Sequence, residues 1–75
     1  MNYPEPNRFY KHYKGGLYKV LFLSRHTETQ EVLVNYQSVH FGSYYARPLD
    51  NWNALAIDDN NKNVERFKLI KNEDL

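Results

Sequence analysis

The sequence predicts a mainly β fold, a small five-stranded barrel with one short helical turn. Three segments alternate apolar and polar residues, glycine, proline or asparagine breaks separate them, and aromatic residues are abundant. The chain has 75 residues with seven tyrosines, four phenylalanines, one tryptophan and no cysteine. A chain of this size buries only about 60% of its unfolded surface. Without disulfides, large rings are therefore expected to build much of the core.

Residues 1–7 contain two prolines and two asparagines and predict an extended arm ahead of a single domain over residues 8–70. An aromatic first strand follows, and the glycine pair Gly15-Gly16 predicts a turn into the strand Gly16–Arg25. The two-residue period places Val20 and Phe22 on one face. We expect both in the core, where Phe22→Ala would cost about 3–5 kcal/mol.

The segment from Glu31 to Val39 alternates most regularly and places Val32, Val34 and Tyr36 on one face. A turn with Gly42 leads to a further strand. Pro48 cannot donate to a sheet ladder, so this stretch should lie at an edge or near a strand end. The strand spans Tyr44–Leu49.

Asp50–Ala56 predicts one helical turn capped by its first or second residue. Asp58–Asn63 is loop-like in composition, Val64–Ile70 predicts the last strand, and residues 71–75 form a polar tail. Five short strands with tight turns and one helical turn are typical of small barrels of SH3-like or OB-like kind, whose closure hides sheet edges.

The charge pattern argues against a strong general polyanion binder, because the formal net charge is only +1. Charge is nevertheless uneven. Up to Gln30 there are five cations and two anions, whereas from Glu31 onward there are five cations and seven anions. This asymmetry has two readings, ordinary solvated strand faces or a basic patch in the first part of the chain.

No apolar run is long enough to span a bilayer, and the N-terminus lacks the pattern of a signal peptide. A cytoplasmic protein without membrane partners is therefore expected. The absence of cysteine agrees with a reducing compartment.

Catalytic and metal sites are not predicted. The three histidines, His12, His26 and His40, have no metal-ligand spacing, and no cofactor motif or nucleophile with an oriented base is present. We therefore expect no catalytic residues, no metal and no cofactor, and interpret the chain as a non-enzyme.

Binding is better supported by the sequence. Strand parity places Arg47 beside Tyr45, and a guanidinium there must pair with an anion, reach solvent or contact a ligand. Glu31 and Glu65 are internal partners for a structural pair, and both readings stay open. The candidate ligand-binding residues are Arg25, His26, Tyr45, Arg47, Lys14 and Tyr13.

These residues combine cations with rings that could stack on a ligand. The leading hypothesis is a binding module for an anionic, ring-containing molecule of nucleotide type, or for a short nucleic acid. The alternative is an SH3-like adaptor that binds a protein, or a homodimer, because tyrosine and arginine also dominate protein interfaces. The oligomeric state is left open.

The chain also resembles a bacterial and phage family of unknown function, DUF1653. The likeness extends from about Tyr10 to Phe67 and includes Tyr10-Lys11-His12-Tyr13-Lys14-Gly15-Gly16, Tyr18-Lys19-Val20, Arg25 to Glu31, Val34-Asn35-Tyr36, Arg47-Pro48-Leu49 and Arg66-Phe67. The chain departs from the family's usual Trp-x-Arg-Pro by having Tyr45-Ala46-Arg47-Pro48, and Asn51 to Asn63 is divergent and rich in asparagine. The resemblance implies a compact SH3-like barrel, implies no reaction, and is compatible with a phage accessory role.

Overall fold

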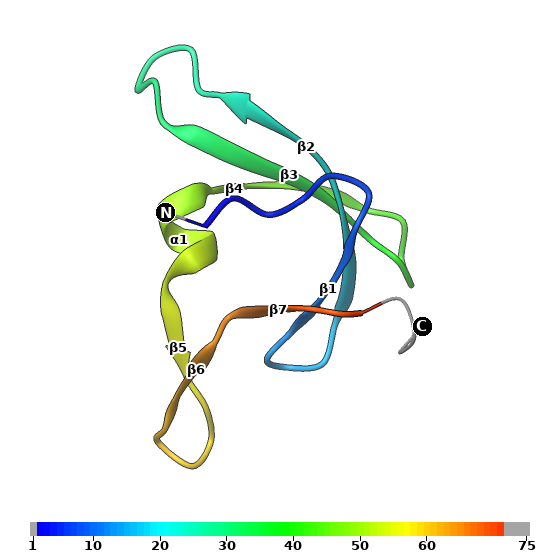
Figure 1. The fold of residues 1–75 in the computed structure, drawn as a ribbon, viewed down its shortest axis with the longest axis vertical. Helices are drawn as coiled ribbons and strands as arrows, with labels where there is room; N and C mark the ends of the chain where they lie inside the picture. The colour runs from blue at the N-terminus through cyan, green and yellow to red at the C-terminus, as the bar shows by residue number, and fades with distance from the viewer. Residues whose placement is uncertain (1, 72–75) are drawn as a thin grey trace.

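The computed structural model describes residues 2–71 and shows a mainly β protein with one short helix (Figure 1). Five antiparallel strands form one sheet in the order β4-β3-β2-β1-β7, and two more form a separate hairpin. The elements are β1 (Phe9–His12), β2 (Leu17–Arg25), β3 (Val32–Ser38), β4 (Tyr44–Pro48), α1 (Leu49–Asn53), β5 (Leu55–Ile57), β6 (Asn63–Glu65) and β7 (Phe67–Leu69).

The sheet curls strongly, so that its upper strands, β3 and β4, face the lower strands β1 and β7 across the interior (Figure 1). Strands β4 and β7 are its two edges, and within residues 2–71 they do not pair with each other. The prediction of a mainly β fold with one helical turn is thus confirmed, whereas closure into a barrel is not found. The helix and the β5–β6 hairpin lie on the open side of the curl (Figure 1).

The predicted turn between the first two strands is confirmed. Gly15 has a φ of +109°, a conformation that side-chain-bearing residues rarely adopt, and β1 pairs with β2 directly across this turn. The Gly15 N–H donates to the carbonyl of His12 at 2.8 Å. This turn places Tyr13, which follows β1, against Arg66, which directly precedes β7.

The placement of Phe22 in the core was wrong. Val20 pairs with Tyr36 but Phe22 pairs with Asn35, so one extra residue is inserted in β2 at this point. Such a bulge reverses the alternation of faces beyond it. Phe22 is therefore 54% exposed on the outside, and Leu23 packs against the core in its place.

The core combines two fully buried valines, Val20 and Val34, with a set of buried rings. The expected face of β3 is confirmed, since Val34 and Tyr36 are buried and Val32 packs against the core. Trp52 of α1 stacks on Phe67 of β7 with ring centroids 3.7 Å apart. Aromatic surface thus joins the helix to the far edge of the sheet, as expected for a small chain without disulfides.

Several boundaries after β4 differ from the prediction. The helix begins one residue earlier, after Pro48, whose fixed φ suits a helix start, and no side chain caps it. It ends at Asn53 because the chain becomes extended at Ala54. The predicted last strand is interrupted by a bend at Arg66, which separates β6 from β7. Local composition could not show that β5 pairs with β6.

The N-terminal arm crosses the open side of the curled sheet and is held at several points (Figure 1). The Glu5 N–H donates to the Tyr10 hydroxyl at 2.9 Å, and the Asn53 side chain donates to the Asn2 carbonyl at 2.8 Å. Pro4 is buried. Of the predicted polar tail, residues 72–75 lie outside the described residues. The helix of residues 2–71, α1, has five residues and is too short to cross a bilayer.

Candidate ligand-binding site

Four of the six predicted binding residues lie on two elements that face each other. Tyr13 and Lys14 belong to the β1–β2 turn, and Tyr45 and Arg47 belong to β4. The Lys14 ammonium lies 5.7 Å from the centre of the Tyr13 ring. Tyr18 on β2 lies between the two groups, because its ring is 6.2 Å from that of Tyr45 and 6.5 Å from that of His12, the last residue of β1.

The other two predicted residues, Arg25 and His26, lie at the tip of the β2–β3 hairpin, at the opposite end of the molecule from the β5–β6 hairpin (Figure 1). Arg25 donates to the carbonyl of Gln30 at 2.7 Å. The Nδ1 atom of His26 accepts hydrogen bonds from the backbone N–H groups of Glu28 and Thr29. Both side chains therefore shape their own loop, and the structure does not bring them together with the other four.

Arg47 pairs with neither of the glutamates considered from the sequence. Its Nε donates to the Tyr36 hydroxyl at 3.1 Å, and Nη1 donates to Asn51 Oδ1 at 2.6 Å. Its guanidinium carbon lies 5.3 Å from the centre of the Phe67 ring. These contacts join β4 to α1 and β7 and hold the guanidinium at the rim of the aromatic core.

His12, at the end of β1, faces the same region. Its ring lies 4.9 Å from Phe67 and 4.6 Å from Tyr13. Its Nδ1 accepts the backbone N–H of Lys14 at 3.1 Å, so the neutral imidazole carries its proton on Nε2. The ring therefore offers an N–H donor without being charged.

Burial lowers the pKa of His12 below its ordinary value of 6.5, and the positive charges of Arg47, Arg66 and Lys14 lower it further. We call these four residues, His12, Lys14, Arg47 and Arg66, the cation cluster. Within residues 2–71 no carboxylate forms an ion pair with a member of the cluster, and the ion pair that is present joins Arg8 to Glu5 elsewhere. The cluster thus brings positive charge together without compensation.

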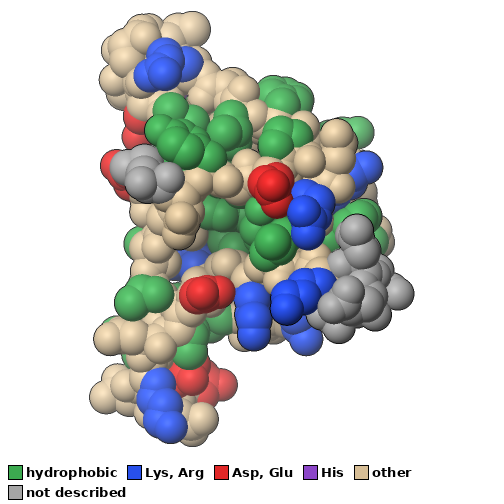
Figure 2. Space-filling model, viewed as in Figure 1, with side chains coloured by type: hydrophobic (Ala, Val, Ile, Leu, Met, Phe, Trp, Pro, Cys, Tyr) green, Lys and Arg blue, Asp and Glu red, His purple; other side chains and the backbone are tan. Residues whose placement is uncertain are grey.

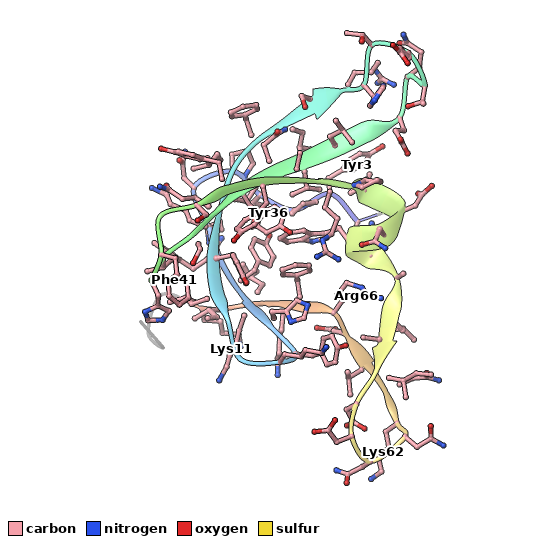
Figure 3. All side chains as sticks on the ribbon, turned by 180° about the vertical axis from the view of Figure 1, so that it is seen from behind. Tyr3, Lys11, Tyr36, Phe41, Lys62 and Arg66 are labelled. Atoms are coloured by element: carbon pink, nitrogen blue, oxygen red, sulfur yellow. The ribbon has the colours of Figure 1, made fainter. Side chains whose placement is uncertain are left out.

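Arg66 was not among the residues predicted from the sequence. It occupies the bend between β6 and β7, where its carbonyl accepts the Tyr13 N–H at 3.0 Å. Its Nε is buried and has no hydrogen-bond partner in the described part of the chain. A buried polar atom without a partner costs free energy. Figure 3 shows Arg66 and Tyr36 directed into the interior of the curled sheet.

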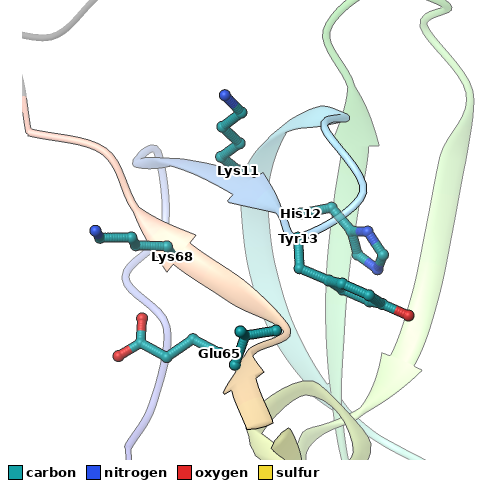
Figure 4. Close-up of a pocket in the computed structure, with 6 residues that line it drawn as sticks. Lys11, His12, Tyr13, Glu65 and Lys68 are labelled. Atoms are coloured by element: carbon teal, nitrogen blue, oxygen red, sulfur yellow. The ribbon is translucent and has the colours of Figure 1, made fainter. Parts of the chain in front are cut away.

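Rings surround the cation cluster, and some remain accessible. Tyr45 is 45% exposed, and its ring lies 5.5 Å from that of Tyr36. Tyr13 and Tyr18 are partly buried. A cavity of about 410 Å³ borders the cluster and is lined by Lys11, His12, Tyr13, Val64, Glu65 and Lys68 (Figure 4). In chemical terms the region offers guanidinium and imidazole donors beside ring faces, the groups that hold a phosphate and an aromatic ring.

The described residues contain no group of three His, Asp or Glu side chains placed to hold a metal ion.

A family model described as "Protein of unknown function (DUF1653)" matches residues 8–69, most of the chain. The chain belongs to the DUF1653 family. It is similar to the crystal structure of a DUF1653 protein from Bordetella bronchiseptica, with 31% identity and a TM-score of 0.77. That likeness covers 89% of this chain and 87% of the other. None of the curated proteins matches this chain.

The DUF1653 match includes every member of the cation cluster. His12 and Arg66 are the cluster members that sequence reasoning missed as binding residues. In the sequence, the Arg66-Phe67 pair was noted only as part of the family resemblance. The alternation of a predicted strand gives no sign of a bend at Arg66, and so it could not show that this side chain points inward.

Proposed function

We propose that this chain is a non-enzymatic binding module of SH3-like partial-barrel type. It takes an anionic, ring-containing molecule of nucleotide type, or a short nucleic acid, at the cation cluster. The proposal includes no catalytic residue, because the cluster provides donors and ring faces but no carboxylate base within residues 2–71. Lys14 on the β1–β2 turn and Tyr45 on β4 are exposed beside this region.

The observation that carries the proposal is the uncompensated charge of the cluster. Burial lowers the pKa of His12, two guanidinium groups and a lysine lower it further, and the buried Nε of Arg66 has no partner within residues 2–71. These positive charges repel one another, and the repulsion destabilises the folded state. A bound phosphate or carboxylate would offset the repulsion and supply acceptors to Arg66, Arg47 and the Nε2–H of His12.

The rings beside the cluster indicate the rest of the ligand. Tyr45 is the exposed ring next to Arg47 on β4, the Tyr18 ring lies 6.2 Å from it, and the Tyr13 ring lies against His12. A base or similar ring stacked on one of these side chains contributes about 1–3 kcal/mol. An anion with an attached ring therefore fits the site better than an anion alone.

The test is thermal unfolding of the chain with AMP, GMP, adenosine and inorganic phosphate. A ligand present at 100 times its Kd stabilises by about 2.7 kcal/mol, so a nucleotide should raise the Tm by about 10 °C or more. Arg66→Gln should abolish most of that shift. Arg25→Gln, at the distant hairpin tip, is the matched control and should keep it. If neither these nucleotides nor a short oligonucleotide raises the Tm of the parent at millimolar concentration, the proposed function is wrong.

A second candidate function, the protein-binding adaptor or homodimer, is favoured by the edge strand β4. Phe22 is 54% exposed and Tyr44 73% exposed, and both line a surface depression beside this edge. The Ser38 N–H donates to the Ser43 carbonyl, so alternation along the ladder turns the N–H groups of Tyr44 and Ala46 away from β3. These groups could pair with β4 of a second copy.

Ala46→Pro tests this candidate, because it removes an outward N–H without breaking the pairing with β3. Sedimentation should show a dimer for the parent and a monomer for the variant. A parent that sediments as a monomer at high concentration would exclude the homodimer.

A further inference from the structure

Two lysines face each other directly across the neighbouring strands β1 and β7. The register pairs Lys11 with Lys68, and both side chains are exposed. Like charges directly opposite on a sheet are destabilising. Lys19 of β2 lies on the same face, because it pairs with Phe9, two residues from Lys11. We call Lys11, Lys19 and Lys68 the lysine face.

Among residues 2–71, the lysines of this face form no ion pair. Glu65 is the carboxylate among the residues that line the adjoining 410 Å³ cavity, and no ion pair links it to Lys11 or Lys68 within residues 2–71. Figure 4 shows the Lys11 ammonium directed away from this carboxylate. Lys and Arg side chains gather at the side of the molecule formed by β1 and β7 (Figure 2). The fold therefore joins cations of the basic first part of the chain with one from β7.

Lys11 and Lys68 lie on the opposite face of the sheet from His12, which pairs with Phe67, and the two regions adjoin at the cavity beside Tyr13. Tyr13 lines the cavity that Lys11 and Lys68 border, and its ring also packs against His12 of the cluster. Lys14 extends over the same ring. A chain of phosphates that begins at the cluster would thus meet further cations after passing Tyr13.

We propose that the ligand of this chain is a single-stranded nucleic acid, with one nucleotide at the cation cluster and the adjoining backbone phosphates on the lysine face. The inference rests on the proposed function and narrows it. A lone nucleotide at the cluster would leave the opposed lysines without a counter-charge. A strand carries one negative charge per nucleotide, so its adjoining phosphates neutralise both ammonium groups. Charge complementarity and the exposed rings favour a single strand, because unstacked bases are free to stack on side chains.

The experiment compares AMP with eight-nucleotide single strands of DNA and RNA and with an eight-base-pair duplex, by titration at several salt concentrations. In Lys11→Gln/Lys68→Gln the affinity for the octamers should fall about tenfold, and the slope of log K against log salt should become shallower by about 1.4. AMP binding should stay as in the parent. Lys62→Gln, in the β5–β6 loop, is the matched control and should leave both ligands unchanged.

Unfolding of the same double variant gives an independent readout, since removal of the opposed charges should keep or raise the Tm. A loss of binding therefore cannot be ascribed to a loss of fold. The inference is overturned if the octamers bind no tighter than AMP, if the duplex binds tighter than the single strands, or if the double variant retains the parent's salt slope. Absence of binding by AMP and octamers alike would instead overturn the proposed function itself.

Discussion

Replacing Arg47 by lysine tests the central contact of the candidate site. The guanidinium donates from Nε to the buried Tyr36 hydroxyl and from Nη1 to Asn51, and lies over Phe67. Lysine keeps the positive charge but has one nitrogen, which cannot reach both acceptors from the same position. The substitution therefore separates the geometry of the side chain from its charge.

The expected cost follows from these contacts. A hydrogen bond to a buried neutral group contributes about 1 kcal/mol, and a cation–π contact contributes about 0.5–1 kcal/mol. The bond to Asn51 is solvent-exposed and adds little. Because lysine reproduces neither contact in this geometry, Arg47→Lys should lower the free energy of unfolding by about 1.5–2 kcal/mol. For a domain of this size that corresponds to a fall in Tm of roughly 5–15 °C.

Thermal and urea unfolding measure this change, and titration with AMP measures binding of the same variant. Arg25→Lys is the control, because it alters an exposed loop contact and should change stability by less than about 0.5 kcal/mol. A Tm within 2 °C of the parent would refute the structural role of the guanidinium. An unchanged Tm together with unchanged AMP affinity would remove Arg47 from the site altogether.

The remaining predictions concern the bulge and the imidazole. Because Phe22 is outside, Phe22→Ala should cost less than about 1 kcal/mol, whereas Val20→Ala should cost about 2 kcal/mol; urea unfolding that reverses this order would show that the bulge is absent. The lowered pKa of His12 means that the unfolded chain binds the proton more readily, so stability should be lost as pH falls below about 6.5. The fall in Tm between pH 7.5 and 5.5 should be smaller in His12→Gln, and an equal fall in both proteins would contradict this. Nucleotide affinity should change in the opposite direction and increase as pH falls, because a bound anion favours the protonated ring; calorimetry in two buffers measures the proton uptake.

Part of the site was accessible to sequence reasoning. The cations and tyrosines of the β1–β2 turn and of β4 were identified because local composition and strand parity suffice to find them. The loop from Arg25 to Gln30 has the same composition, yet its side chains satisfy its own backbone. Composition cannot distinguish a loop that binds a ligand from one that binds itself, since both need the same donors and acceptors.

The sequence by itself determined the mainly β class, the glycine turn after β1, the buried face of β3 and the family. Each of these depends on residues close together in the chain, through φ preference or a two-residue period. Only the tertiary structure decided that Phe22 is outside, because one inserted residue in β2 reverses the alternation without a mark in the composition. It alone also brought the charges of Arg66 and Arg47 close enough to His12 to lower its pKa, in addition to burial, and set Lys68 opposite Lys11. Electrostatic interaction depends on distance in space, and the curl of the sheet brings together charges that lie more than fifty residues apart in the chain.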